Sequence, residues 1–69
     1  MADDNVYKIL ELAGTSTTGV EDAIATAIGK ASATVRNIRW FEVEQLRGHV
    51  ENGKVAHYQV MLKVGFTLE

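Results

Sequence analysis

An Asn-Gly dipeptide at residues 52–53 separates two long segments in which apolar and polar residues alternate, 38–50 and 55–68. Asn-Gly is the strongest short-range signal for a hairpin, because a type I′ turn needs positive φ at both central residues. A two-residue turn also sets the register, so that Glu51 faces Lys54 and every later pair follows. The sequence therefore predicts a long antiparallel hairpin in the C-terminal half of the chain.

The predicted register places the only tryptophan, Trp40, opposite Gly65. A glycine opposite a large aromatic side chain leaves the indole bare on one side, where we expect a flat ligand to lie. The same count makes Gln59 face Leu46. It predicts three further facing pairs: Phe41 with Val64, Glu42 with Lys63, and Val43 with Leu62.

The first half of the chain predicts one strand and one helix. Residues 6–12 are rich in β-forming residues, and residues 14–19 are typical of a loop. Thr18-Gly-Val-Glu21 matches a capping box, in which Thr18 and Glu21 satisfy the first backbone donors of a helix. Apolar residues then recur at helical spacing, up to an end near residues 32–34: Val20, Ala23, Ile24, Ala27, Ile28 and Ala31. The predicted order of elements is β-α-β-β.

The lengths of these elements do not match. A helix of about 15 residues spans ~22 Å, whereas strands of 13 residues span ~43 Å, so one helix covers only half of the hairpin. The hairpin residues expected to pack against the helix are Phe41, Val43, Val60, Leu62, Val64 and Phe66. Nearer the turn the same face becomes Gln45, Arg47, His49 and Tyr58. The opposite face carries enough apolar residues to form a large exposed patch in a monomer, which indicates partner subunits or a ligand: Ile38, Trp40, Leu46, Val50, Val55 and Met61.

Composition limits the classes of protein that fit. A chain of 69 residues buries only about 60% of its unfolded surface, and without cysteines it has neither disulfides nor thiolate sites. Oligomerisation is then the expected source of stability. We expect no signal peptide and no membrane segment, and with them a cytoplasmic location. The net charge of −2 argues against nucleic acid as the main partner.

Several uncommon strings, in one order, resemble the dodecin family: Arg36-Asn-Ile-Arg-Trp-Phe-Glu-Val43, Arg47-Gly-His49, Gly53-Lys-Val-Ala-His-Tyr-Gln-Val60 and Lys63-Val-Gly-Phe66. Dodecins are small flavin-binding proteins, and the resemblance extends over essentially the whole chain as a single domain, 1–69. It implies an α+β fold with a three-stranded antiparallel sheet, order 1-3-2, packed on one helix. It also implies a hollow homododecamer that holds paired FMN or riboflavin molecules.

By this resemblance Trp40 stacks on the flavin and Gln59 hydrogen-bonds its ring. An indole is large and rigid and stacks on a flat heteroaromatic ring, while the Gln59 amide has both a donor and an acceptor for the edge of the flavin. The fork of donors on Arg47 suits a phosphate or a carboxylate. Family members often carry arginine where this chain has Thr67, so the contact of that arginine is not implied here.

Each of these residues also has a purely structural interpretation. Trp40 can be an interface tryptophan, and Gln59 and Arg47 can be solvated strand residues. Trp40 and Gln59 stand ~20 Å apart along the hairpin, so we expect a shared pocket to form between chains unless a bulge intervenes.

No metal or catalytic site is expected. His49 and His57 fall on opposite faces in the predicted register, which argues against a shared metal, and no nucleophile–base arrangement is visible. With the dodecin resemblance, the favoured function is non-enzymatic flavin storage that suppresses flavin photochemistry. The alternative is a structural, self-assembling shell in which ligand binding is incidental.

Overall fold

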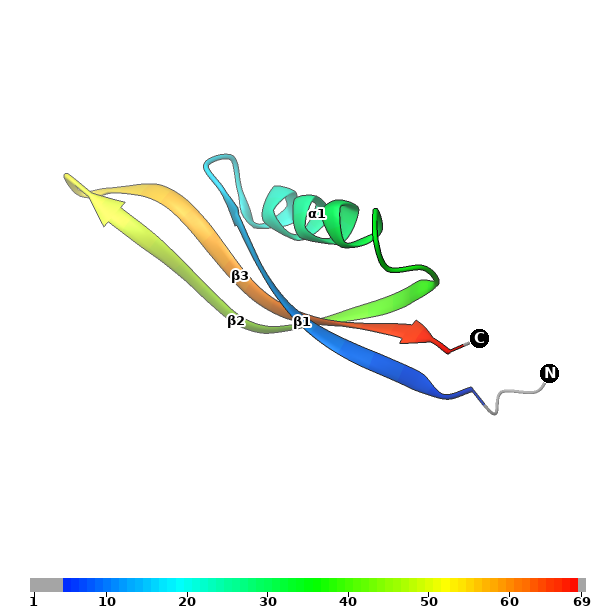
Figure 1. Ribbon diagram of the computed structural model, residues 1–69. Coiled ribbons are helices and arrows are strands. Elements are labelled where there is room, and N and C mark those ends of the chain that lie inside the picture. Colours follow the sequence, from blue (N-terminus) through cyan, green and yellow to red (C-terminus); the bar gives the residue numbers. More distant parts are fainter. Residues whose placement is uncertain (1–4, 69) are drawn as a thin grey trace.

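A computed structural model describes residues 5–68. They form one helix and three strands: β1 (Tyr7–Ser16), α1 (Val20–Ala31), β2 (Ile38–Glu51) and β3 (Lys54–Thr67). The strands make one antiparallel sheet in the order β1-β3-β2. Helix α1 lies across one face of this curved sheet, and the β2–β3 hairpin extends beyond it (Figure 1). The predicted α+β fold and strand order are confirmed.

The hairpin turn has the predicted conformation. Asn52 and Gly53 both have positive φ, 54° and 76°, as a type I′ turn requires. Glu51 faces Lys54, and Trp40 faces Gly65, as predicted. The three other predicted pairs are also confirmed: Phe41 with Val64, Glu42 with Lys63, and Val43 with Leu62.

Bulges displace the register in the middle of the hairpin. Glu44 in β2 and Ala56 in β3 each lack a facing partner, so the residues between them pair one position away from the predicted count. Gln59 therefore faces Arg47, and the predicted Gln59–Leu46 pair is wrong. A bulge places two residues opposite one, and the alternation of apolar and polar residues does not mark where this happens.

The displaced register changes which residues share a face. Leu46 faces the buried Val60, on the side of the helix. His49 faces His57, so the prediction that they lie on opposite faces is wrong. Ile38, predicted on the face away from the helix, packs against the core, because a further bulge separates it from Trp40.

We call the sheet face away from α1 the open face. On β2 and β3 it carries Trp40, Glu42, Gln45, Arg47, His49, His57, Gln59, Met61, Lys63 and Gly65. On β1 it carries Tyr7, Ile9, Glu11, Ala13 and Thr15. Gln45, Arg47 and His49, predicted on the helix side, thus lie on the same face as Trp40 and Gln59.

Strand β1 is longer than predicted, because the segment 14–16 pairs with β3 instead of forming a loop. Gly14 explains this difference. A Cβ atom there would collide with the carbonyl oxygen of Ala23 and lie 2.9 Å from the Cβ of Ala27. Glycine at this position therefore lets the strand run directly beneath the helix.

The predicted capping box at the start of α1 is wrong. The N-cap is Gly19, which makes no side-chain cap. The buried Ser16 at the end of β1 instead holds the connection before the helix: its Oγ accepts hydrogen bonds from the N–H groups of Thr18 (2.9 Å) and Gly19 (3.2 Å). The same hydroxyl donates to Oδ2 of Asp22 at 2.7 Å. One side chain thus ties the strand, the connection and the first helical turn together.

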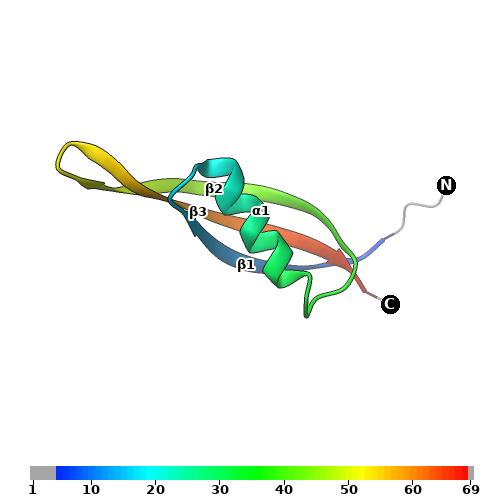
Figure 2. The same cartoon turned by 90° about the horizontal axis from the view of Figure 1, so that it is seen from above.

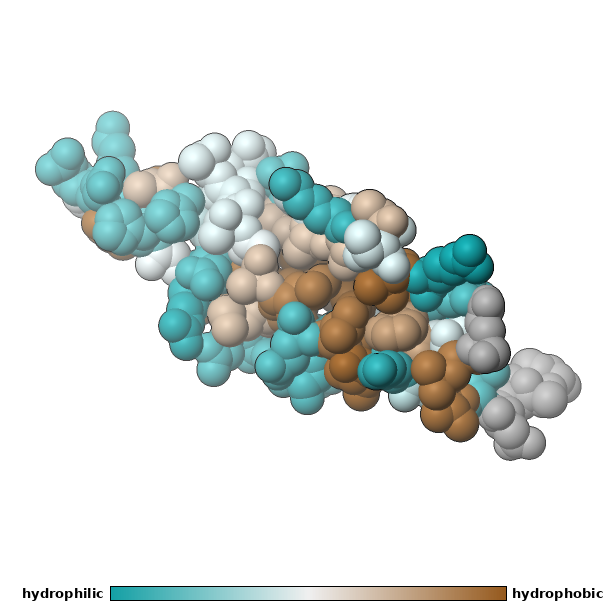
Figure 3. All heavy atoms as spheres, viewed as in Figure 1, coloured by the Kyte–Doolittle hydropathy of each residue, from teal (hydrophilic) through white to brown (hydrophobic). Residues whose placement is uncertain are grey.

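Helix α1 packs on β1 and β3, and Figure 2 shows it crossing the sheet while the hairpin extends past its end. Among residues 5–68, the fully buried apolar residues are Ala23, Val60, Leu62 and Val64. On β2, Phe41 and Val43 were predicted to pack against the helix. They remain 48% and 41% exposed, because β2 is the edge strand that the helix does not reach. In Figure 3 apolar atoms gather below α1, and hydrophilic atoms cover most of the hairpin tip.

Candidate functional site

The Trp40 indole lies against the main chain of Gly65. A Cβ atom at Gly65 would overlap Cε2 and Cζ2 of the indole and lie 2.6 Å from its Nε1. The indole therefore fills the space that a side chain would occupy, and the glycine gives it a backbone surface to lie on rather than leaving that side bare. The residue is half-buried, so part of the indole remains accessible on the open face.

Tyr7 is a neighbour of Trp40 that sequence analysis missed. The two ring centroids are 6.0 Å apart and the ring planes meet at 70°, an edge-to-face arrangement. Tyr7 faces Thr67 on β3, two residues from Gly65 and on the same face. Tyr7 reaches Trp40 because β1 pairs with β3. No turn joins these two strands, so the sequence contains no signal that fixes their register. Trp40, Gly65 and Tyr7 form what we call the indole half-site.

Gln59 and Arg47 form a second group, which we call the amide half-site. They face each other across β3 and β2. Arg47 Nη2 donates to Oε1 of Gln45 at 2.6 Å, and Gln59 Nε2 donates to the Sδ of Met61 at 3.7 Å. A thioether is a weak acceptor, so the Gln59 amide can exchange it for a ligand carbonyl at small cost.

The two half-sites are far apart within one chain. Gln59 precedes Gly65, the partner of Trp40, by six residues on β3, which corresponds to about 20 Å. The bulges change the partner of Gln59 but do not shorten this separation. Thr67 lies at the end of β3 nearer the indole half-site, and its N–H donates to the carbonyl oxygen of Asn37 at 3.2 Å.

A charged group lies between the half-sites. Lys63 Nζ is 3.1 Å from Oε2 of Glu44, although Glu42 is its facing residue, because the bulge redirects the Glu44 side chain. The hydrogen bond and the charge of Glu44, with smaller contributions from Glu42 and Glu11, raise the pKa of Lys63 above its usual value. A hollow of about 510 Å³ beside it is lined by Glu11, Glu44, Gln45, Arg47 and Met61.

The two histidines stack near the hairpin tip. Their ring centroids are 5.4 Å apart with planes 15° from parallel, and His49 Nε2 lies 3.4 Å from Oε2 of Glu51. The predicted reason for excluding a shared metal, opposite faces, is therefore wrong. Residues 5–68 contain no group of three His, Cys, Asp or Glu side chains that could hold a metal ion.

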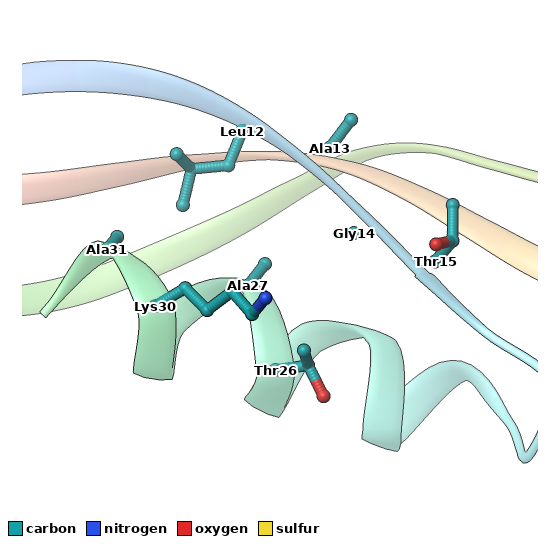
Figure 4. Close-up of a pocket in the computed structure, with 8 residues that line it drawn as sticks. All are labelled: Leu12, Ala13, Gly14, Thr15, Thr26, Ala27, Lys30 and Ala31. Carbon is teal, nitrogen blue, oxygen red and sulfur yellow. The ribbon is translucent and has the colours of Figure 1, made fainter. Parts of the chain in front are cut away.

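A separate cleft of about 440 Å³ lies between β1 and α1. Figure 4 shows Lys30 extending along the helix beside Ala27, across from Gly14 and Thr15 of the strand. Its lining contains no aromatic side chain to stack a flat ligand. Within the described part of the chain, no helix is long and apolar enough to cross a membrane.

The family model for dodecin matches residues 6–69. The chain belongs to the dodecin family. A dodecin from Thermus thermophilus is 50% identical over 64 residues, which cover 93% of each chain. The structure of the dodecin from Streptomyces coelicolor superimposes with a TM-score of 0.90 at 48% identity, covering 99% of this chain and 97% of that one.

A more distant dodecin carries the name of a ligand, calcium. The calcium dodecin of Mycobacterium tuberculosis is 33% identical over 64 residues, covering 93% of this chain and 90% of its own. Its crystal structure, described as calcium-chelating with a calcium-binding site, has a TM-score of 0.79 over 93% of this chain and 91% of that one. Calcium is thus named for one relative of the same fold, and the ligand of this chain must be argued from its own residues.

Proposed function

We propose that this dodecin binds and stores a flavin, FMN or riboflavin, in pockets between the subunits of a homododecameric shell, without catalysing a reaction. The observation that carries the proposal is the Trp40 indole, placed against Gly65 and partly accessible on the open face. A flat aromatic ring that covers the Trp40 indole can stack on it in the favourable offset arrangement. Stacking against an oxidisable indole would also quench the excited flavin by electron transfer and so suppress its photochemistry.

The amide half-site suits the polar edge of the same ligand. Gln59 has a planar amide that can accept from a ring N–H and donate to a ring carbonyl. Arg47, directly opposite, has a fork of donors that suits the phosphate of FMN. Because about 20 Å separates Gln59 from Trp40 in one chain, a flavin that contacts both must bridge two subunits.

The shape of the subunit supports assembly. Its radius of gyration is 14.3 Å, whereas a compact chain of this length has about 11 Å. On the helix side of β2, Phe41, Val43 and Leu46 are 41–57% exposed. They add to the exposed Tyr7 and Ile9 of the open face, and they also favour the alternative function, a structural shell in which Trp40 serves only an interface.

A flavin titration separates the two functions. We expect the parent protein to bind FMN or riboflavin with quenched flavin fluorescence that returns on denaturation. Trp40→Ala should weaken binding by roughly 0.5–1.5 kcal/mol for each stacked pair lost and reduce quenching. Its sedimentation should match that of the parent, and a parallel Ca²⁺ titration tests the ligand named for the M. tuberculosis relative. Equal binding and quenching in parent and variant would contradict the proposal, and loss of assembly would favour the structural alternative.

A further inference from the structure

Three strands contribute to the surroundings of the single tryptophan. Trp40 is on β2, the glycine beneath it is on β3, and the ring that meets it edge-to-face is on β1. Gly65 supports the indole from the sheet but has no side chain to limit its sideways movement. Tyr7 supplies a side wall at a centroid distance of 6.0 Å.

We propose that Tyr7 is a positioning residue, which holds the Trp40 indole in one orientation before any ligand arrives. The role of that orientation in flavin binding rests on the proposed function, whereas the orientation itself is a property of the free protein. Edge-to-face pairs have a preferred geometry, so the Tyr7 ring favours one arrangement of the indole over others. An indole ordered in advance loses less conformational freedom when a flat ring stacks on it.

The proposal assigns the effect to the ring of Tyr7 and not to its hydroxyl group. The edge-to-face contact is made between rings, and Tyr7→Phe retains it. Tyr7→Leu keeps an apolar side chain of moderate size but removes the aromatic edge. Tyr7 therefore acts through Trp40, and the two variants should differ in the behaviour of the indole even without ligand.

The first experiment uses the free protein. Trp40 is the only tryptophan, so its fluorescence anisotropy decay, excited where tyrosine does not absorb, reports the motion of this one indole. We expect Tyr7→Phe to match the parent and Tyr7→Leu to show a faster and larger loss of anisotropy. Tyr58→Leu is the matched control, because Tyr58 faces Gly48 and Ser16 on the helix side, away from Trp40.

The second experiment titrates the same proteins with FMN. We expect the Kd of Tyr7→Leu to rise about two- to tenfold, the worth of one aromatic pair, with Tyr7→Phe and Tyr58→Leu unchanged. An indole equally rigid in parent and Tyr7→Leu overturns the inference, whether or not FMN binds. An indole loosened only in Tyr7→Leu supports the positioning even if the parent binds no FMN, a result that would overturn the proposed function instead.

Folding of the variants is checked by sedimentation. If Tyr7→Leu does not assemble, Tyr7→Val replaces it, since a β-branched residue suits an edge strand. Failure of both variants to assemble, with Tyr7→Phe intact, would assign Tyr7 to assembly and overturn the positioning role.

Discussion

At the scale of single residues, two bulges in the hairpin cancel each other: Ala56 is the extra residue in β3 and Glu44 is the extra residue in β2. Trp40 therefore still faces Gly65, although the pairs of residues 45 to 49 are displaced by one position. For this reason a count from the Asn-Gly turn predicts the contact between Trp40 and Gly65 but not the partner of Gln59. Tyr7 could not be predicted in the same way, because β1 is separated from β3 by a helix and not by a turn that sets the register.

The environment of Lys63 gives a prediction for alkaline pH. Glu44 raises the pKa of Lys63 above the ordinary 10.5, so the folded state favours the charged form. The stabilisation is present below pH 10.5 and is lost as the pH rises through the elevated pKa of the folded state. We expect the urea midpoint of the parent to exceed that of Lys63→Met near neutral pH, and the difference to shrink above pH 10.5.

Because the pair is exposed, the difference should be small and should also decrease with added salt. Both proteins are measured at one concentration, so that the contributions of assembly and of the other titrating groups are common to both midpoints and cancel in their difference. A gap between the two midpoints that stays constant through this alkaline range would contradict the assignment.

At the scale of elements, the helical repeat predicted α1 well, but the way the helix begins depends on a contact that sequence spacing does not show. Thr18 and Glu21 have the spacing of a capping box, yet Ser16 accepts the N–H groups of Thr18 and Gly19. Ser16 is brought there by the extension of β1, which the loop-like composition of residues 14–19 concealed. The close approach of Gly14 to the helix is a tertiary contact that overrides this local preference.

Replacing Ser16 should therefore lower the free energy of unfolding more than replacing Thr18. Ser16→Ala removes the acceptor of two part-buried N–H groups and should lower the free energy of unfolding by about 1–3 kcal/mol, the cost of leaving such groups without a partner. Thr18→Ala, the matched control, should lower it by less than half as much. Urea unfolding of both variants checks this, and a larger effect for Thr18→Ala would restore the capping box.

At the scale of the whole molecule, the single chain is elongated, 52 × 21 × 17 Å. Its accessible surface is 5055 Å², compared with about 4,300 Å² for a compact monomer of this mass. The length mismatch between one helix and a long hairpin, which the sequence predicted, accounts for this shape. The helix side of β2 also stays uncovered, contrary to the prediction, because β2 is the edge strand that the helix does not reach.

The separation of the half-sites predicts complementation between subunits. Gln59→Ala should weaken flavin binding by about 1–3 kcal/mol, because polar groups of the ring lose their partner, while quenching by Trp40 is retained. Refolded mixtures of Trp40→Ala and Gln59→Ala subunits should contain a fraction of pockets with near-parental affinity, measured as a second phase in the flavin titration. A single phase equal to one of the two variants would mean that both residues act within one chain.

The bulged residues also define where this hairpin tolerates a change of length. Glu44 and Ala56 have no facing partner, so a chain that lacked both would keep Gln59 opposite Arg47 and Trp40 opposite Gly65. Deleting any other single strand residue between positions 40 and 65 would instead shift every facing pair on one side of the deletion by one position. Insertions and deletions that preserve the binding residues should therefore occur at these two positions, and an alignment that places a gap there need not imply a different pocket.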